Sequence, residues 1–103
     1  MKNEMYKDYT TSLALQKRNE PALYQIVVLN DDFTPMEFVI SLLERIFYLG
    51  RLTATKIMLE AHVSGKAACG TFTKDVAETK LHAVCEFART HEHPLTCTME
   101  IAG

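Results

Sequence analysis

A strand, a polar turn and a helix start follow one another early in this chain and leave its backbone few alternatives. Residues 24–29 are almost continuously apolar and rich in β-branched side chains, which predicts a strand buried on both faces near the centre of a sheet. Asn30, Asp31 and Asp32 favour a turn directly after it. The run Thr34–Glu37 then supplies a capping hydroxyl, a proline at the first helical position and a capping-box glutamate, so it predicts a capped helix.

Apolar spacing and stop signals predict the remaining elements. These are the end of the first helix near Gly50, a second helix over about 53–64 stopped by Gly65, a short strand over 66–72, a third helix capped by Thr73, and an alternating, half-buried strand over 95–101. The order β-α-α-β-α-β predicts an α+β fold, in which three helices pack on one face of a small three-stranded antiparallel sheet.

The length of 103 residues fits a single domain with one modest core. Residues 1–20 are polar and carry no sustained period, so we expect a flexible N-terminal tail before a core domain over residues 21–103. Nothing in the sequence argues for more than a monomer.

Charge and hydropathy exclude several classes of function. With 11 basic and 13 acidic residues the net charge is −2. The chain therefore lacks the excess of basic residues that is typical of nucleic-acid binding, and it has no polybasic segment for a membrane surface. No apolar run approaches the ~20 residues of a membrane span, and the first twenty residues hold no signal-peptide stretch. We expect a cytoplasmic protein. Cys69, Cys85 and Cys97 are odd in number and lack a C-x-x-C pair, so we expect free, buried thiols.

The acidic turn after the first strand is the main candidate for chemistry. Its plain interpretation is turn formation. Its functional interpretation is an acceptor-rich lip, formed by Asn30–Asp32, that suits a cation with several N–H donors such as a primary ammonium. His62 could add a polar group, and Met36 and Met58 could line an adaptable apolar surface, although such residues more often serve as surface or core.

Catalytic and metal-binding motifs are missing or incomplete in this sequence. There is no P-loop, dinucleotide-binding or nucleophile-elbow pattern, and a calcium loop starting at Asp31 would need glutamate where Leu42 stands. His91, His93 and Cys97 do not supply four ligands, so a solvated helix end is preferred to a zinc site. We therefore expect neither a metal nor a cofactor.

Residues 24–100 resemble the ClpS family of adaptor proteins. The resemblance is carried by one long string and several shorter matches at family spacing: Asn30-Asp31-Asp32-Phe33-Thr34-Pro35-Met36-Glu37-Phe38-Val39, Met58-Leu59, His62, Gly65-Lys66, Cys69-Gly70, Ala77-Glu78-Thr79-Lys80 and Glu92-His93-Pro94-Leu95.

The resemblance implies a non-enzymatic adaptor. Such proteins bind N-degron substrates, whose free first residue is Phe, Leu, Tyr or Trp, and deliver them to the AAA+ unfoldase of the Clp protease, ClpA in many bacteria, thereby modulating its substrate choice. The implied fold, a three-stranded antiparallel sheet with three helices, agrees with the pattern above. By position, the family's unfoldase contacts fall on Asp75, Lys80 and Glu92, and the N-terminal tail takes part in delivery.

Two binding subsites also carry over by position. The α-amino site falls on Asn30, Asp31 and His62, which offer a carbonyl, a carboxylate and a ring nitrogen to the donors of the ligand's ammonium. The apolar side-chain pocket falls on Asp32, Thr34, Met36, Met58, Ala61 and Leu95. Ala61 stands where the family commonly has a larger β-branched residue, which changes the shape of the pocket. Asp75 stands where glutamate is common, which shortens the reach to a partner.

Two other functions stay open at this point. An acid–base enzyme built on Asp31, Asp32 and His62 would also need a nucleophile or a metal-bound water, and no candidate is present. A plain interaction domain would need no acceptor cluster beside a methionine-lined pocket. Binding of peptides that begin with free Phe or Leu distinguishes these alternatives from an adaptor.

Overall fold

The computed structural model describes residues 22–102, so the predicted tail over 1–20 and the outermost residues of the predicted core, Pro21 and Gly103, lie outside the described residues. The elements are β1 (Leu23–Leu29), α2 (Met36–Phe47), α3 (Arg51–Ser64), β2 (Lys66–Thr73), α4 (Lys74–Thr90) and β3 (Cys97–Ile101). The predicted order of elements is confirmed. Within the described range, no helix has both the length and the apolar character needed to cross a membrane.

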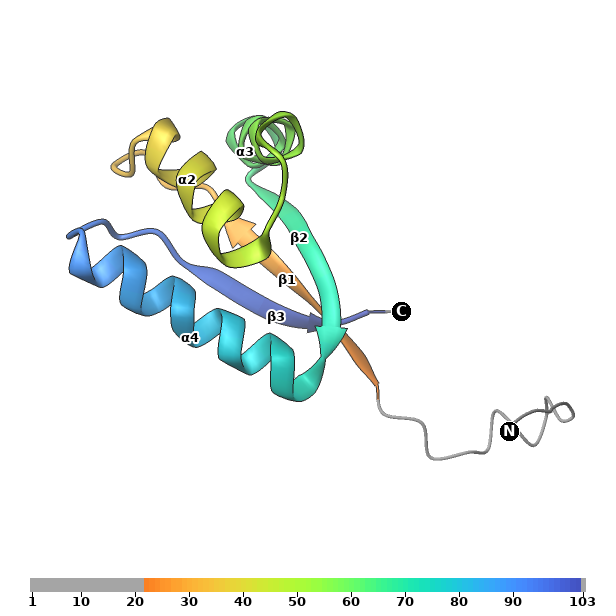
Figure 1. Ribbon diagram of the computed structural model, residues 1–103. Coiled ribbons are helices and arrows are strands. Elements are labelled where there is room, and N and C mark those ends of the chain that lie inside the picture. Colours follow the sequence, from red (N-terminus) through yellow and green to blue (C-terminus); the bar gives the residue numbers. More distant parts are fainter. Residues whose placement is uncertain (1–21, 103) are drawn as a thin grey trace, which may run out of the picture.

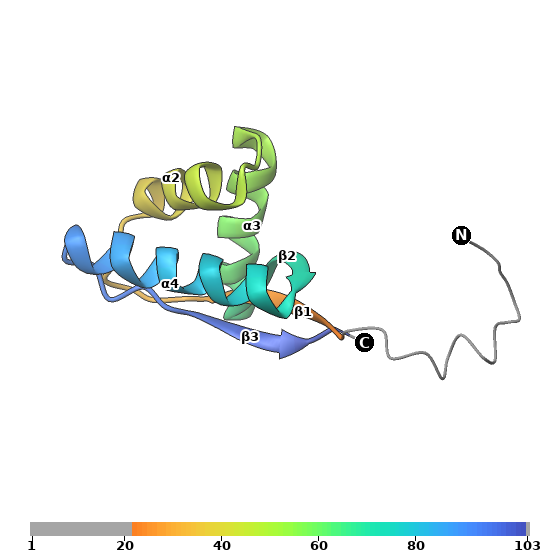
Figure 2. The same cartoon turned by 60° about the horizontal axis from the view of Figure 1, so that its bottom comes forward.

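The strands form one antiparallel sheet in the order β2-β1-β3, so β1 is central, as predicted. Figure 1 and Figure 2 show that α2, α3 and α4 cover one face of this sheet. Ile26 and Val28 of β1 are buried beneath these helices together with Leu42, Leu43 and Val84. A single apolar layer between sheet and helices therefore holds the fold together.

Val27 lies on the opposite face of the sheet and is nevertheless only 2% exposed. Lys66 lies opposite Leu29 on one side of β1, and Glu100 lies opposite Gln25 on the other. The Lys66 Nζ reaches the Glu100 Oε2 at 3.4 Å, so this ion pair must cross β1 between those two positions. The lysine stem that leads to this ion pair therefore passes across the face that carries Val27, the face that the helices leave uncovered, where Gln25 and Leu29 are half-buried.

The predicted capping box at the start of α2 is wrong. Pro35 occupies the N-cap position with extended backbone (φ −62°, ψ 142°), and no side chain caps the helix. The Thr34 hydroxyl donates instead to the Asp31 carboxylate, and the Glu37 carboxylate accepts two hydrogen bonds from Arg51. Both side chains have taken a charged partner in place of a neutral backbone N–H, and charge-assisted hydrogen bonds are the stronger ones.

The two helix ends predicted at glycines differ from each other. Gly65 ends α3 as predicted: its φ is 94°, and its N–H donates to the Ala61 carbonyl oxygen at 2.8 Å. Gly50 does not end α2, because the left-handed C-cap is Tyr48 (φ 53°, ψ 37°), whose N–H donates to the Leu43 carbonyl oxygen. Gly50 is the N-cap of α3.

The cysteines do not share one environment. Cys69 and Cys97 are buried in the core, whereas Cys85 on α4 is exposed, so the prediction of buried thiols is wrong for Cys85. Cys85 directly follows the buried Val84 on α4, and one residue along an α-helix turns the side chain by about 100° away from the core. A hydrogen bond with Cys69, together with burial, raises the pKa of the Cys97 thiol.

Both ends of the described chain meet at one end of the sheet. The Ala102 N–H donates to the Leu23 carbonyl oxygen at 2.9 Å, which joins the last and first described segments. From there β1 runs the length of the sheet to Asn30, where the acidic turn begins (Figure 1). The turn therefore lies at the far end of β1 from both ends of the described chain.

Candidate binding site

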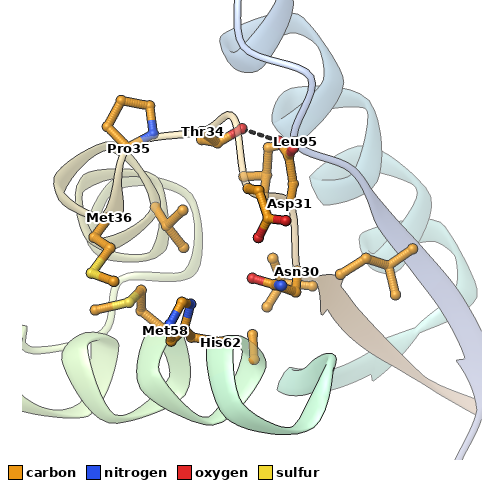
Figure 3. Close-up of a pocket in the computed structure, with 13 residues that line it drawn as sticks. Asn30, Asp31, Thr34, Pro35, Met36, Met58, His62 and Leu95 are labelled. Carbon is orange, nitrogen blue, oxygen red and sulfur yellow. Dashed lines mark hydrogen bonds between the residues drawn. The ribbon is translucent and has the colours of Figure 1, made fainter.

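A cavity of about 270 Å³ opens where β1 passes into the acidic turn. Four segments build its walls: the end of β1, the turn with the start of α2, the second half of α3, and the residue Leu95 before β3 (Figure 3). Its lining consists of Val28, Leu29, Asn30, Asp31, Asp32, Thr34, Pro35, Met36, Val39, Met58, Ala61, His62 and Leu95. Pockets for drug-sized ligands usually measure about 300–1,000 Å³, so this cavity suits a single large side chain.

Polar side chains occupy one side of the cavity. Figure 3 shows Asn30 and Asp31 from the turn and His62 from α3 around the same space. The Asn30 N–H donates to the Gly65 carbonyl oxygen at 2.9 Å, which joins the end of β1 to the end of α3. Because His62 lies in the last turn of α3, this hydrogen bond also sets the position of His62 relative to the turn.

The Asp31 carboxylate is held by its own turn. The Phe33 N–H donates to Oδ1 at 3.0 Å, and the hydroxyl of the buried Thr34 donates to Oδ2. An ionised carboxylate has about four acceptor positions, so each oxygen keeps capacity for a further donor. The turn thus presents an oriented carboxylate that can still accept hydrogen bonds from a ligand.

The other walls of the cavity are apolar. Met58, Ala61 and Leu95 are buried, whereas Met36, the first residue of α2, is 48% exposed. Figure 3 shows both methionines across the cavity from the polar turn. Flexible thioethers adapt well to guests of different shape, and the exposure of Met36 places it at the mouth.

The structure gathers around this cavity all the residues predicted for the α-amino and side-chain subsites. Sequence reasoning did not name four further lining residues, which are Val28, Leu29, Pro35 and Val39. Their positions in the sequence could have indicated them. Val28 and Leu29 end the strand that leads into the turn, and Val39 lies one helical turn after Met36.

The lining of the cavity carries negative charge. Asp31 and Asp32 contribute carboxylates, and none of the lining residues is lysine or arginine. Asp32 is exposed at the rim, and Asp31 is half-buried. A ligand group that enters this side of the cavity is therefore favoured when it is cationic and rich in N–H donors.

An arginine joins the two helices that flank the cavity. Arg51, the first residue of α3, donates two hydrogen bonds to the Glu37 carboxylate of α2, at 2.7 and 2.8 Å, and its other nitrogen lies 3.6 Å from Glu44. The hydrogen bonds to Glu37 raise the pKa of the Arg51 guanidinium. Because Glu37 follows Met36 directly, this bridge connects the helix that bears the mouth methionine to the helix that bears His62.

The residues predicted for the unfoldase interface do not form one cluster. Asp75 is exposed in the first turn of α4, and Glu92 is exposed just beyond its end with φ 60°. Lys80 is half-buried, and its ammonium donates to the Ile46 carbonyl oxygen at 2.7 Å. Five residues along an α-helix correspond to a turn of about 140°, so Asp75 and Lys80 point in different directions.

The histidines near the end of α4 pack against an aromatic ring. His91 and His93 lie with ring centroids 5.4 and 4.4 Å from that of Phe38 on α2. Among residues 22–102, no group of three His, Cys, Asp or Glu side chains is placed to hold a metal ion. These imidazoles thus contribute to the contact between α2 and the segment that follows α4.

Together, the fold and the cavity define a class of protein: a small α+β binding domain whose apolar cavity is bordered on one side by oriented acceptors and negative charge. Residues 19–98 match the sequence family described as ATP-dependent Clp protease adaptor protein ClpS. The chain belongs to this ClpS family of Clp protease adaptors.

Individual relatives cover most of the chain. It is 53% identical over 87 residues to the ClpS adapter protein of Rhodospirillum centenum, which covers 84% of this chain and 81% of that protein. It is 56% identical over 84 residues to ClpS 1 of Agrobacterium fabrum, which covers 82% and 72% respectively. The structure of Agrobacterium tumefaciens ClpS2 bound to L-phenylalaninamide matches with a TM-score of 0.78 and 35% identity over 81% of this chain and 100% of that chain.

Proposed function

We propose that this protein binds substrates through a free N-terminal Phe, Leu, Tyr or Trp and delivers them to the AAA+ unfoldase of the Clp protease, ClpA or its equivalent, in the bacterial cytoplasm. It acts as an adaptor without catalysis of its own, and it modulates which substrates the protease degrades. Its predicted N-terminal tail, residues 1–20, takes part in delivery, and Asp75, Lys80 and Glu92 belong to the surface that meets the unfoldase.

One observation carries this proposal: Asn30, Asp31 and His62 converge on one side of an apolar cavity whose lining holds carboxylates but no lysine or arginine. A peptide N-terminus is the part of a chain that combines an ammonium with an adjacent side chain. The chain interior offers neutral amides, which cannot replace the charge. The ClpS2 structure supports the same conclusion, because the L-phenylalaninamide bound to that protein has a free α-amine and a benzyl side chain.

Each part of the cavity then has a role in recognition. The ammonium donates to the Asn30 side-chain oxygen, to the free acceptor positions of Asp31 and to a neutral ring nitrogen of His62. The first side chain enters the mostly apolar space formed by Thr34, Met36, Met58, Ala61 and Leu95, with Asp32 at its rim. Burial of a Leu or Phe side chain contributes about 1.5–3 kcal/mol, while the charge-assisted hydrogen bonds restrict binding to a free terminus.

The test compares two peptides that differ only at the first nitrogen, one with free N-terminal Phe and one with acetylated Phe. Acetylation removes the charge and leaves acceptors unpaired, so we expect a loss of about 2–5 kcal/mol in binding free energy, measured by titration calorimetry. Binding of the free peptide should also weaken as the pH rises through the α-amine range of about 7.7–8.0, because only the protonated amine supplies the charge.

Asp31→Asn provides the control within the protein. The amide keeps an acceptor oxygen but loses the charge, so the difference in affinity between free and acetylated peptide should narrow. An acetylated Phe peptide that binds wild type within about twofold of the free peptide, or ~0.4 kcal/mol, would contradict the proposed recognition.

A further inference from the structure

The first turn of α2 lacks the support that a helix usually receives from a capping side chain. Pro35 is the N-cap with extended backbone, and the hydroxyl of Thr34 donates to Asp31 instead of to the helix. The first backbone N–H groups of a helix have no partner inside it, so an uncapped first turn opens more easily than the rest. Met36 stands in this turn, at the mouth of the cavity. The position of its side chain therefore depends on whatever else holds the turn.

Arg51 holds this turn from the start of α3. One of its terminal nitrogens donates to both oxygens of the Glu37 carboxylate, at 2.7 and 2.8 Å. The other terminal nitrogen lies 3.6 Å from Glu44, which is two turns farther along α2. Because the guanidinium is planar, contacts at both of its terminal nitrogens fix its direction as well as its distance. Arg51 thus lies along the first turns of α2 and holds the residue directly after Met36.

The charge of Arg51 is unfavourable for α3, the helix to which it belongs. A helix N-terminus carries partial positive charge and favours acidic side chains nearby. Yet α3 begins with this arginine, has no acidic residue in its first turn and has no side-chain cap at Gly50. Glu37, in contrast, is an acidic residue in the first turn of α2, where the helix favours it. The contact of Arg51 with Glu37 therefore supports α2 and not α3.

We propose that Arg51 is a positioning residue for ligand selection: by holding Glu37 it keeps Met36 in place, and it thereby sets how strongly the cavity rejects a first residue that branches at Cβ. This inference rests on the proposed function. The Cβ methyl of Ile lies at the mouth, against the Met36 side chain, whereas Leu branches one carbon farther in. A flexible thioether adapts to such a methyl group when the backbone that carries it can shift. Arg51 prevents that shift.

The experiment measures the affinities of each full-length variant for a Leu-first and an Ile-first peptide. Both peptides carry the same α-ammonium, so effects on the polar side of the cavity cancel in the ratio of the two affinities. Arg51→Gln removes the charge, and Arg51→Lys keeps the charge without the planar guanidinium. Arg89→Gln is the matched control, because Arg89 is also an exposed arginine paired with a glutamate, and it lies outside the cavity. Urea unfolding of each variant reports any general loss of stability.

We expect wild type to prefer Leu by at least about tenfold, and Arg51→Gln to reduce this preference at least about threefold by gaining affinity for Ile, with Leu affinity kept within about twofold. Arg51→Lys should give an intermediate preference, and Arg89→Gln should match wild type. The urea midpoint of Arg51→Gln should stay at the wild-type value, because arginine is unfavourable at the start of α3. In a Met36→Ala background, Arg51→Gln should not change the ratio further, because its effect passes through Met36.

Salt gives a second readout that needs no substitution. Raising the ionic strength from about 0.01 M to about 1 M shortens the Debye length from ~30 Å to ~3 Å, which weakens contacts between exposed charges. The preference of wild type for Leu should therefore fall toward that of Arg51→Gln, whose own preference should stay constant.

A wild-type ratio in Arg51→Gln would overturn the inference. So would a ratio that falls through loss of Leu affinity, or one that still falls in the Met36→Ala background. Equal binding of both peptides by wild type would also overturn it, because no selection would remain for Arg51 to support, and the proposed function would stand. If wild type binds neither peptide, the proposed function itself fails, which is a separate result.

Discussion

Met36 is the single residue best placed to select among first side chains. It opens α2 directly after Pro35, so its backbone is constrained, and its half-exposed thioether stands at the mouth of the cavity. A ligand residue that branches at Cβ would bring a methyl group against this side chain. Residues that branch farther out pass it, and the small Ala61 lies deeper in the wall.

The first residue-scale prediction therefore concerns Leu-first and Ile-first peptides. Wild type should prefer Leu by at least about tenfold, or ~1.4 kcal/mol, and Met36→Ala should narrow this gap by gaining affinity for Ile. Fluorescence titration of the two peptides measures both affinities. Leu59→Ala is the matched control, since Leu59 is 46% exposed and lies outside the cavity, and it should leave the preference intact. Equal binding of both peptides by wild type would show that the space beside Ala61 removes the selection.

Most residues that line the cavity were predictable from the family resemblance, because its matching strings have a specific order and spacing. What no sequence pattern could give is how side chains choose among competing partners. The Thr34 hydroxyl could cap a helix or bind a carboxylate, and the structure shows that it binds Asp31. Lys80 could face solvent or α2, and only the packing of α4 against Phe47 and Phe72 decides this.

At the scale of elements, the end of α3 determines how the cavity closes. Gly65 has φ 94°, and its carbonyl accepts the Asn30 N–H. A Cβ added there would meet no atom within 4 Å, so any cost of substitution comes from the backbone conformation alone. Gly50 offers the contrast, with equally open space but a φ of −69° that every residue adopts.

The element-scale prediction compares these two glycines. Gly65→Ala should lower the free energy of unfolding by about 1–2 kcal/mol, because the left-handed conformation is unfavourable for alanine, and Gly65→Asn should lose less. Gly50→Ala should change the free energy of unfolding by less than about 1 kcal/mol, because the reduced freedom of the unfolded chain offsets the lower preference of alanine for the N-cap of α3. Urea unfolding followed by circular dichroism measures all three. Equal effects of the two alanine substitutions would show that φ does not determine the cost.

Helices and strands were largely predictable, and their ends were not. Apolar spacing located every element, and Gly65 was recognised as a stop. The end of α2 escaped prediction because the left-handed residue is Tyr48, which sequence rules do not favour there. The Tyr48 ring lies 4.8 Å from the Lys80 ammonium of α4, and such a contact between segments far apart in the chain leaves no local pattern in the sequence.

At the scale of the whole molecule, the cavity and the ends of the described chain lie at opposite ends of β1. Leu23 and Ala102 are joined by a hydrogen bond at one end, and the turn at Asn30 opens the cavity at the other. The order of the elements was enough to predict an antiparallel sheet with helices on one face. The lysine that crosses the open face of the sheet could not be predicted, because its position depends on strand order.

The molecular-scale prediction follows from this separation. Deleting residues 2–17 should leave affinity for a Phe-first peptide within about twofold, because the described chain begins at the far end of the sheet from the cavity. Degradation of a Phe-first substrate by the unfoldase and protease should nevertheless fall, if the tail acts in delivery. Calorimetry and a fluorescent-substrate degradation assay give the two readouts. A large loss of peptide affinity would show that the tail contributes to the cavity.

The cavity takes its walls from three parts of the chain that are distant in sequence, residues 28–39, residues 58–62 and Leu95, so recognition depends on the folded state of the whole domain. A nicked or partly unfolded molecule loses the acceptors, the mouth of the cavity and the apolar wall together. It therefore stops binding ligand and does not bind with lower selectivity. Occupancy and folding are linked in the other direction too: ligand at about 100 times its Kd adds ~2.7 kcal/mol to stability. Damage to such an adaptor therefore reduces the number of working copies in the cell and leaves the fidelity of each remaining copy intact.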